Sequence, residues 1–288
     1  PRKISPFFIP SSLINLSSGQ VSIKYNFKGP NHSTVTACAS GAHAIGDSFR
    51  LIQLDKADVM VAGGTEAAIC RLGIAGFCSL RALSTKFNDD PKNASRPFDK
   101  DRDGFVMGDG AGILILEEYE HAKKRNANIL AEIIGYGSSG DAHHITSPPD
   151  DGNGAERCVL SALNDAKKNP EDIDYINAHG TSTPIGDKIE VESIKKIFSK
   201  NLDKIKMSST KSSIGHLLGA SGSVESIYSI LSIKNKKLPP TLNLLSPLPE
   251  AEGLDLIPLN SIDHEVHCVL SNSFGFGGTN VSLIFKSI

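Results

Sequence analysis

The sequence has no apolar run approaching the roughly 20 residues that a membrane-spanning helix needs. Its formal net charge of −2 is close to neutral. A chain without a strong excess of one charge has no electrostatic reason to bind nucleic acid or an anionic membrane surface. The cysteines and histidines show no CxxC pair and no spacing that suits zinc. We therefore expect no nucleic-acid partner, no membrane partner and no metal.

The cysteines are few and odd in number, which argues against a disulfide framework. There are five of them, at positions 38, 70, 78, 158 and 268. Free thiols are the rule in reducing compartments. We therefore expect unpaired cysteines and a cytoplasmic setting.

Short apolar runs alternate with amphipathic helical patterns, which predicts an α/β protein with buried sheets. The expected strands are 59–62, 113–116, 129–134, 175–178, 268–270 and 281–285. The expected helices are 42–52, 155–166, 187–198 and 220–233. A polar stretch at 123–128 suggests two parts, and we place the boundary so that they are 1–127 and 128–288.

A single cysteine stands where an expected strand gives way to a helix, in the segment 36–41 (TACASG). The free amides and the dipole at a helix N-terminus stabilise a thiolate, which predicts a lowered pKa for Cys38. Small neighbours would leave the sulfur accessible to a thioester. The alternative is a buried structural cysteine.

Two histidines stand in motifs rich in small and hydroxyl residues. His179 follows an expected strand in 177–183 (NAHGTST), at the carboxyl end where α/β folds place their sites. His216 follows Lys211 in 211–216 (KSSIGH) and precedes an expected helix. Packing roles for the histidines and a solvated position for the lysine are the alternatives.

A glycine-rich turn occupies 272–280 (NSFGFGGTN), between two expected strands. It is not a phosphate-binding loop, because GxxxxGK[ST] and a following helix are both missing. Backbone amides of such a turn can face an oxyanion, although a plain hairpin is the alternative. The aspartates at 99, 101 and 103 resemble a calcium loop, but the next glutamate comes too late for that frame.

Taken together and in this order, the four motifs closely resemble the β-ketoacyl-acyl carrier protein synthases. The resemblance covers essentially the whole chain, including 5–10 (SPFFIP), 61–64 (VAGG), 81–84 (RALS), 95–99 (SRPFD) and 103–105 (DGF). Within this family the chain looks like the type II elongating enzyme of bacterial-type fatty acid synthesis. The resemblance implies a thiolase-like fold of five layers, αβαβα, and a homodimer.

The resemblance implies a role for each motif residue. Cys38 would carry the acyl group, and His179 and His216 would act on malonyl-acyl carrier protein. Lys211 would support the histidines. The amides of Cys38 and Phe276 would bind an oxyanion, and the Phe276 ring would gate the acyl pocket.

Further residues match supporting positions of the family. Glu225 matches the acidic partner of Lys211, which makes physical sense because an unpaired buried charge is costly. Asp187 and Glu190 match further acidic positions, with solvated helix-face charges as the alternative. The remaining matches are Thr181 and Thr183 for the phosphopantetheine arm, and Arg2, Lys3 and Arg81 for docking of the acidic carrier protein, with ordinary solvated charges as the alternative for these three. Phe8 and Phe77 are expected in the pocket wall, with plain core positions as the alternative.

Two departures from the family pattern bear on these expectations. Ala39 follows the nucleophile where type II members often have threonine. The family's first βαβ region does not precede Pro1, so we expect an N-terminally truncated chain whose N-terminal half is incomplete. No cofactor is expected, because phosphopantetheine arrives on the carrier protein. An organelle of bacterial ancestry is the alternative to the bacterial cytoplasm.

Two other functions compete with fatty acid elongation. A polyketide ketosynthase has the same fold and chemistry, but no attached modules appear here. A non-catalytic chain-length partner subunit usually lacks the nucleophile, and Cys38 with both histidines argues against that reading. A thiolase would need a second cysteine near the C-terminus, where this chain has the glycine-rich turn.

Overall fold

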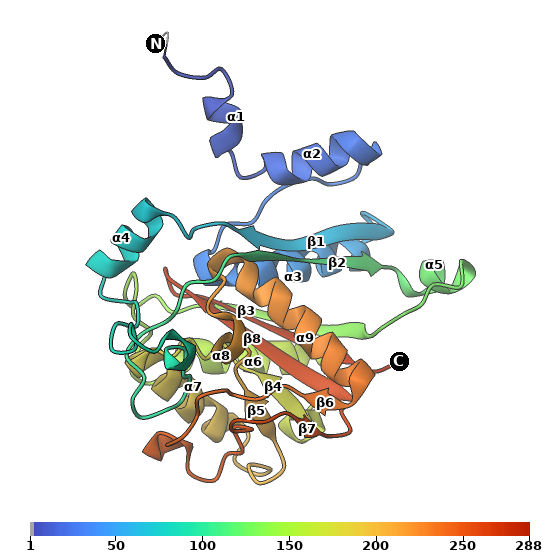
Figure 1. The fold of residues 1–288 in the computed structure, drawn as a ribbon. Coiled ribbons are helices and arrows are strands. Elements are labelled where there is room, and N and C mark those ends of the chain that lie inside the picture. The colour runs from blue at the N-terminus through green and yellow to red at the C-terminus, as the bar shows by residue number, and fades with distance from the viewer. Residues whose placement is uncertain (1–2) are drawn as a thin grey trace.

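The centre of the structure is a mixed five-stranded sheet with the order β3-β9-β8-β4-β5 (Figure 1). The computed structural model describes residues 3–288. Strands β4, β5 and β8 are parallel to one another, whereas β9 is antiparallel to both β8 and β3. The bounds are β3 (Glu132–Gly140), β4 (Tyr175–Asn177), β5 (Lys206–Ser208), β8 (Cys268–Gly275) and β9 (Thr279–Lys286). The carboxyl ends of the three parallel strands therefore meet at one edge.

A second sheet has two antiparallel strands, β1 (Val59–Glu66) and β2 (Gly110–Glu117). Helices α3 (Ser40–Gln53) and α9 (Ser221–Asn235) lie between the two sheets and contact each other. Their backbones approach closely, because a Cβ added at Gly222 would lie 2.7 Å from the Ala42 Cβ. Any larger residue at position 222 would therefore collide with α3, so only glycine allows the two helices to approach this closely.

The other face of the large sheet is covered by α6 (Asn153–Ala166), which packs on β3 and β9, with α7 (Pro184–Ile197) beside it. The layers thus run β1–β2, α3 and α9, five-stranded sheet, α6 and α7 (Figure 1). On the outer face of β1–β2, the side chains of Val61, Ile113 and Ile115 remain exposed. The described residues supply four of the five predicted layers.

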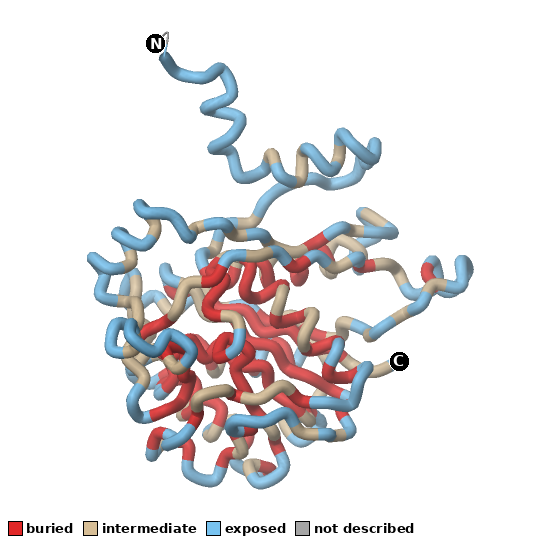
Figure 2. Tube along the Cα trace, viewed as in Figure 1, coloured by how far each residue is buried: buried red, intermediate tan, exposed pale blue. Residues whose placement is uncertain are grey.

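The buried residues concentrate between these layers, whereas the N-terminal segment is mostly exposed and its two helices contain no buried residue (Figure 2). Helices α1 (Phe8–Ser12) and α2 (Leu16–Tyr25) project from the body and bury no residue (Figure 1). The remaining short elements are α4 (Arg71–Ser79), α5 (Tyr119–Lys124), α8 (Lys211–Ile214), β6 (Lys237–Leu238) and β7 (Ile262–Asp263).

The structure contains all six strands and all four helices that the sequence predicts, with shifted ends. The strand expected from residue 129 begins at Glu132, and β5 was not expected. The boundary near residue 127 falls between α5 and β3 and stays a prediction. Over residues 3–288, none of the helices has the length and apolar character needed to cross a membrane.

Candidate active site

Cys38 lies in a tight turn at the start of α3. The turn is the 3-10 segment η1 (Ala37–Ala39), and Ala37 has a positive φ of 50°. A non-glycine residue in this region costs about 1–3 kcal/mol and persists only where its surroundings hold it. Here Thr36 N donates to Ser40 Oγ at 2.9 Å, and Ser40 Oγ donates to the Ala37 carbonyl at 2.7 Å. These bonds fix the position of the sulfur.

The pKa of the Cys38 thiol is raised to about 11, chiefly by burial. The positive charge of Lys211 and the backbone amides of Phe276 and Cys38 itself oppose this effect without cancelling it. The prediction of a lowered pKa is therefore wrong. The helix N-terminus is present, but removing the sulfur from water outweighs it.

His216 contacts the cysteine directly. Its Nε2 lies 3.1 Å from Cys38 Sγ, and its ring meets the Phe105 ring edge to face at 5.3 Å between centroids. The backbone on both sides is pinned, because His216 N donates to Val106 O at 2.7 Å and Gly108 N donates to His216 O at 2.9 Å. The position of the ring beside the sulfur is thus fixed by a strand-like pairing between residues 106–108 and His216.

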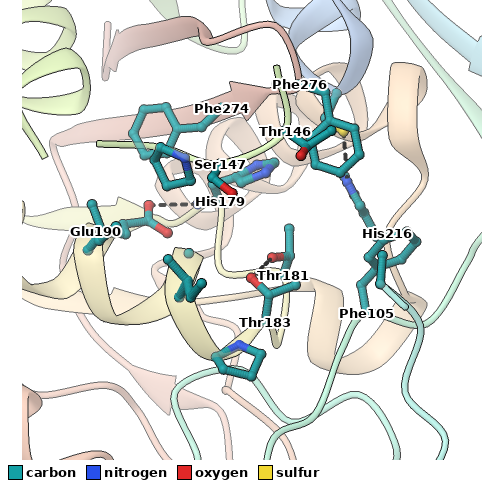
Figure 3. A pocket seen from close by; sticks show the side chains of 18 of the residues that line it. Phe105, Thr146, Ser147, His179, Thr181, Thr183, Glu190, His216, Phe274 and Phe276 are labelled. Carbon is teal, nitrogen blue, oxygen red and sulfur yellow. Dashed lines mark hydrogen bonds between the residues drawn. The ribbon is translucent and has the colours of Figure 1, made fainter. Parts of the chain in front are cut away.

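His179 lies beside His216, just beyond the end of β4. The two rings meet edge to face at 5.4 Å between centroids, and Phe274 packs against His179 at 5.7 Å. The buried Nδ1 of His179 has no hydrogen-bond partner within residues 3–288. The structure thus brings the two predicted histidines and Cys38 together. Figure 3 shows both imidazoles in the cavity.

Both imidazoles are neutral at pH 7. Burial lowers the pKa of His179 and of His216 well below the usual value, and the charge of Lys211 lowers both further. A neutral imidazole has one N–H donor and one acceptor nitrogen. Each ring can therefore donate one hydrogen bond to a developing negative charge without itself carrying a charge.

Lys211 and Glu225 form a buried ion pair behind the histidines. Each side chain is 1% exposed, and Lys211 Nζ donates to the Glu225 carboxylate and, at 2.5 Å, to the His179 carbonyl. Burial raises the pKa of Glu225, and the charge of Lys211 opposes that rise. The alternative of a solvated lysine is wrong. The ammonium reaches the backbone of His179, not the cavity.

Asp187 and Glu190 project from α7 into the protein, so the alternative of solvated charges is also wrong. Glu190 accepts hydrogen bonds from His179 N at 2.8 Å and Gly180 N at 2.7 Å. Asp187 accepts from Phe98 N at 2.8 Å and Ser182 N at 3.1 Å. Burial raises the pKa of Asp187 to about 6 and that of Glu190 to about 7, against the effect of these bonds. Their role is to hold the turn that carries His179.

A cavity of about 350 Å³ leads from the surface to the sulfur. Thr181 and Thr183 stand on its wall with their hydroxyls 2.9 Å apart (Figure 3). Other lining residues are Cys38, Phe77, Arg81, His179, His216, Phe274 and Phe276. In the described part of the chain no group of three or more His, Cys, Asp or Glu side chains could hold a metal ion.

Comparison with known proteins accounts for this arrangement. Family models described as "Beta-ketoacyl synthase, N-terminal domain" and "Beta-ketoacyl synthase, C-terminal domain" match residues 1–122 and 130–245. The 3-oxoacyl-[acyl-carrier-protein] synthase 2 of Rhizobium meliloti is 60% identical over 99% of this chain and 68% of its own length. This chain belongs to the β-ketoacyl synthase family.

Other relatives agree with this membership. The mitochondrial 3-oxoacyl-[acyl-carrier-protein] synthase of Arabidopsis thaliana is 57% identical over the whole chain, which spans 63% of that relative. The structure of a ketosynthase in complex with its type II PKS acyl-carrier protein matches with a TM-score of 0.97 at 37% identity. The match covers 100% of this chain and 70% of the chain in that structure. A β-ketoacyl synthase from Burkholderia phymatum matches with a TM-score of 0.90 at 42% identity, and the match covers 95% of this chain and 65% of the other. The fold is therefore the thiolase-like fold of ketosynthases.

Some residues that the sequence assigned to this β-ketoacyl synthase site lie elsewhere. Phe8 is 57% exposed on the projecting helix α1 and does not line the cavity, because no part of the described chain packs over α1. Lys3 is exposed on the same arm. Arg81 does line the cavity, whereas Arg2 lies outside the described residues.

Sequence reasoning missed several residues of the synthase site. Phe105 and Phe274 pack against the imidazoles, and Ser221 Oγ lies 2.9 Å from His216 Nδ1. Thr146 and Ser147, from the loop after β3, also line the cavity (Figure 3). Phe105 and Phe274 stand within motifs that carry the resemblance, so that signal was available. For Ser221 and the loop the sequence gives no local signal.

Proposed function

We propose that this β-ketoacyl synthase catalyses the decarboxylative Claisen condensation of malonyl-acyl carrier protein with an acyl group held on Cys38, and so elongates fatty acids. One observation carries the proposal. A thiol and two neutral imidazoles meet at the inner end of one cavity, with 3.1 Å between Cys38 Sγ and His216 Nε2. This set can bind one thioester covalently and stabilise the enolate of another.

In the first half-reaction, Cys38 sulfur attacks the carbonyl of the acyl thioester on the carrier protein. A new C–S bond forms, the old C–S bond breaks, and the thiol proton ends on the departing phosphopantetheine sulfur. The tetrahedral oxyanion would be bound by the amides of Cys38 and Phe276, which both act to lower the pKa of the Cys38 thiol. The Phe276 ring would gate access to the acyl group.

In the second half-reaction, malonyl-acyl carrier protein loses carbon dioxide. The electrons of the broken C–C bond form an enolate whose oxygen would accept N–H bonds from His179 and His216. The enolate carbon then attacks the acyl carbonyl, and the bond to Cys38 sulfur breaks. The products are β-ketoacyl-acyl carrier protein, carbon dioxide and a Cys38 thiolate, which takes one proton from solvent.

Thr181 and Thr183 are the proposed contacts for the phosphopantetheine arm, because their hydroxyls line the cavity between surface and sulfur. Arg81 and Lys3 are proposed to bind the acidic carrier protein, and Arg2 with them. Lys211 is proposed to support both imidazoles through its charge and its bond to the His179 carbonyl. We propose no cofactor beyond the arm that the carrier protein brings.

We further propose a homodimer in the bacterial cytoplasm or in an organelle of bacterial ancestry. Support for the dimer comes from large apolar side chains exposed along the N-terminal segment: Ile4, Phe7, Phe8, Ile9, Leu13, Ile14, Val21, Ile23, Tyr25, Phe27 and Val35. Exposed apolar clusters of this kind mark interaction surfaces. A second copy of the chain is the partner that the proposal commits to.

Polyketide chain extension is the second candidate, favoured by the TM-score of 0.97 to a type II polyketide ketosynthase. The higher identity of 60% to a 3-oxoacyl-[acyl-carrier-protein] synthase 2 favours fatty acid elongation. The product decides between them. A fatty acid synthase of this type releases its chain after one extension, whereas a polyketide enzyme adds several malonyl units before release.

The test is intact mass after incubation of the full-length protein with a long-chain acyl-acyl carrier protein. We expect one acyl adduct, which is lost in Cys38→Ala and retained in the matched control Cys158→Ala, because Cys158 is buried elsewhere between α6 and β9. We expect His216→Ala to keep the adduct and to lose malonyl decarboxylation. An adduct in Cys38→Ala refutes the nucleophile, and loss of both steps in His216→Ala makes that histidine structural.

A further inference from the structure

Helix α9 has five buried serines, which are Ser221, Ser223, Ser226, Ser229 and Ser232. The first of them differs from the other four in its hydrogen bond. The last four donate their hydroxyl protons to carbonyls three or four residues earlier in the chain, at distances of 2.7–2.9 Å. This is the ordinary arrangement for a serine inside a helix. Ser221 Oγ instead lies 2.9 Å from Nδ1 of His216.

The direction of the Ser221 bond follows from counting protons. The hydroxyl is buried, and in the described chain its one hydrogen-bond partner is His216. If Nδ1 donated to Ser221, the hydroxyl proton would have no acceptor, at a cost of about 1–3 kcal/mol. If Ser221 donates to Nδ1, that proton is satisfied. The neutral ring must then carry its single N–H on Nε2.

The Nε2 atom is the one that faces the reaction. It lies 3.1 Å from Cys38 Sγ, whereas Nδ1 faces the start of α9. The ring is thus held at both nitrogens. His179 has no equivalent restraint in residues 3–288, because its buried Nδ1 has no partner.

We propose that Ser221 is a positioning residue that fixes the tautomer and orientation of His216, so that a protonated Nε2 points at the site of the enolate oxygen. This inference rests on the proposed function. Ser221 itself touches neither substrate nor the cysteine. It acts by keeping one of the two oxyanion donors in the donating form before the malonyl thioester arrives.

The test compares Ser221→Ala with Ser229→Ala in the full-length protein. Both remove a buried hydroxyl from the same helix, but only Ser221 bonds the imidazole. Steady-state release of carbon dioxide from malonyl-acyl carrier protein gives kcat and KM, and intact mass gives the rate of Cys38 acylation. We expect Ser221→Ala to lower kcat for decarboxylation about tenfold, which is less than the roughly 10²–10³-fold effect of deleting an oxyanion donor outright.

We expect KM and the rate of Cys38 acylation to stay within about twofold of the wild type, since neither needs the enolate donor. Ser229→Ala should leave all three quantities unchanged. Equal kcat values for the two variants would overturn the proposal, and so would an equal fall of acylation and decarboxylation in Ser221→Ala, which would indicate general distortion.

A second measurement does not depend on the variant folding. The ¹⁵N chemical shifts of the His216 ring in the wild-type protein distinguish a protonated nitrogen from an acceptor nitrogen. We expect Nε2 protonated and Nδ1 as acceptor; the reverse assignment overturns the proposal. A wild-type protein that neither acylates nor decarboxylates would refute the proposed function, while the ring shifts would still decide the role of Ser221.

Discussion

Cys38 experiences two opposing effects of its position. The start of α3 and the nearby ammonium of Lys211 favour a thiolate, whereas burial favours the neutral thiol and raises the pKa to about 11. The resting enzyme therefore holds a protonated thiol. Its reactivity depends on how the substrate and the amides of Cys38 and Phe276 are brought to it, not on a standing negative charge.

This balance predicts how Cys38 responds to pH. Only the thiolate is alkylated, and a pKa of about 11 leaves roughly 10⁻⁴ of the thiol ionised at pH 7. The rate of alkylation by iodoacetamide should therefore rise about tenfold per pH unit from pH 7 to 10 without a plateau. The measurement is intact mass in a Cys70→Ser/Cys78→Ser background, which removes the exposed thiols. A plateau below pH 8 would contradict the raised pKa.

The pair Lys211–Glu225 predicts a large effect on stability. Lys211→Met leaves the buried Glu225 carboxylate without its partner, which should lower the free energy of unfolding by about 3–5 kcal/mol. The matched control is Lys236→Met, which breaks an exposed pair with Glu265 and should leave the free energy of unfolding nearly unchanged. Denaturant unfolding measures both.

A double variant completes this test. Lys211→Met/Glu225→Met removes both charges, so it should be more stable than the sum of the two single changes predicts. Simple additivity of the three unfolding free energies would contradict a direct interaction in the folded protein.

At the residue scale, motif spacing predicted which side chains meet but not their ionisation. Cys38, His179 and His216 could be identified because each stands next to an element end in a recognisable motif. The raised pKa of Cys38 could not be predicted, because its burial depends on Phe105 and Leu218, which other segments bring to the site. Phe8 was placed in the pocket by resemblance alone, and the structure leaves it on an exposed arm.

At the element scale, the site exists because three parallel strands end at one edge of the sheet. His179 follows β4, Lys211 follows β5, and Phe276 follows β8. The sequence predicted two of these strands and missed β5, whose three residues are too few for a pattern. The burial of Asp187 was equally unpredictable, because one of the backbone amides that bind it belongs to Phe98, far away in the sequence. Glu190 binds the amides of His179 and Gly180 in the turn before α7, and the sequence alone does not show that this turn folds back onto the helix.

The crossing of α3 and α9 predicts a contrast between two glycines. Gly222→Ala would place a Cβ 2.7 Å from the Ala42 Cβ and 2.9 Å from its backbone nitrogen, so it should destabilise the protein by about 1–3 kcal/mol. Gly76→Ala on α4 meets nothing within 4 Å and should stabilise that helix by about 0.5–1 kcal/mol. Thermal unfolding of both variants checks this. A neutral Gly222→Ala would show that the helices are not in close contact.

At the scale of the whole molecule, the same arrangement of a helix and two strands occurs at two places in the chain. In each, a helix lies against an antiparallel strand pair: α3 against β1–β2 and α9 against β8–β9. The large sheet has five strands, whereas the β1–β2 sheet has two and leaves Val61, Ile113 and Ile115 exposed on its outer face. Fold class was predictable because this layering follows from alternating strand and helix patterns.

The proposed homodimer predicts a measurable mass. Light scattering of the full-length protein should give twice the chain mass at micromolar concentration. Val35→Glu should shift the protein towards one chain, because it puts a charge among the exposed apolar side chains of the N-terminal segment, where Val35 is 63% exposed. Leu160→Glu, at a similarly exposed site on α6, is the control and should leave the dimer intact. If both variants had the same mass, the N-terminal segment would not be part of the dimer interface.

The central claim, that Cys38 carries the acyl group between the two half-reactions, is tested most directly by a chase. The protein is acylated, freed of the acyl donor and mixed with malonyl-acyl carrier protein, while intact mass follows the enzyme and the carrier protein together. We predict that the acyl adduct disappears at the rate at which a β-ketoacyl-acyl carrier protein two carbons longer appears, with one carbon dioxide released per chain. Product that forms while the adduct on Cys38 persists would contradict the account.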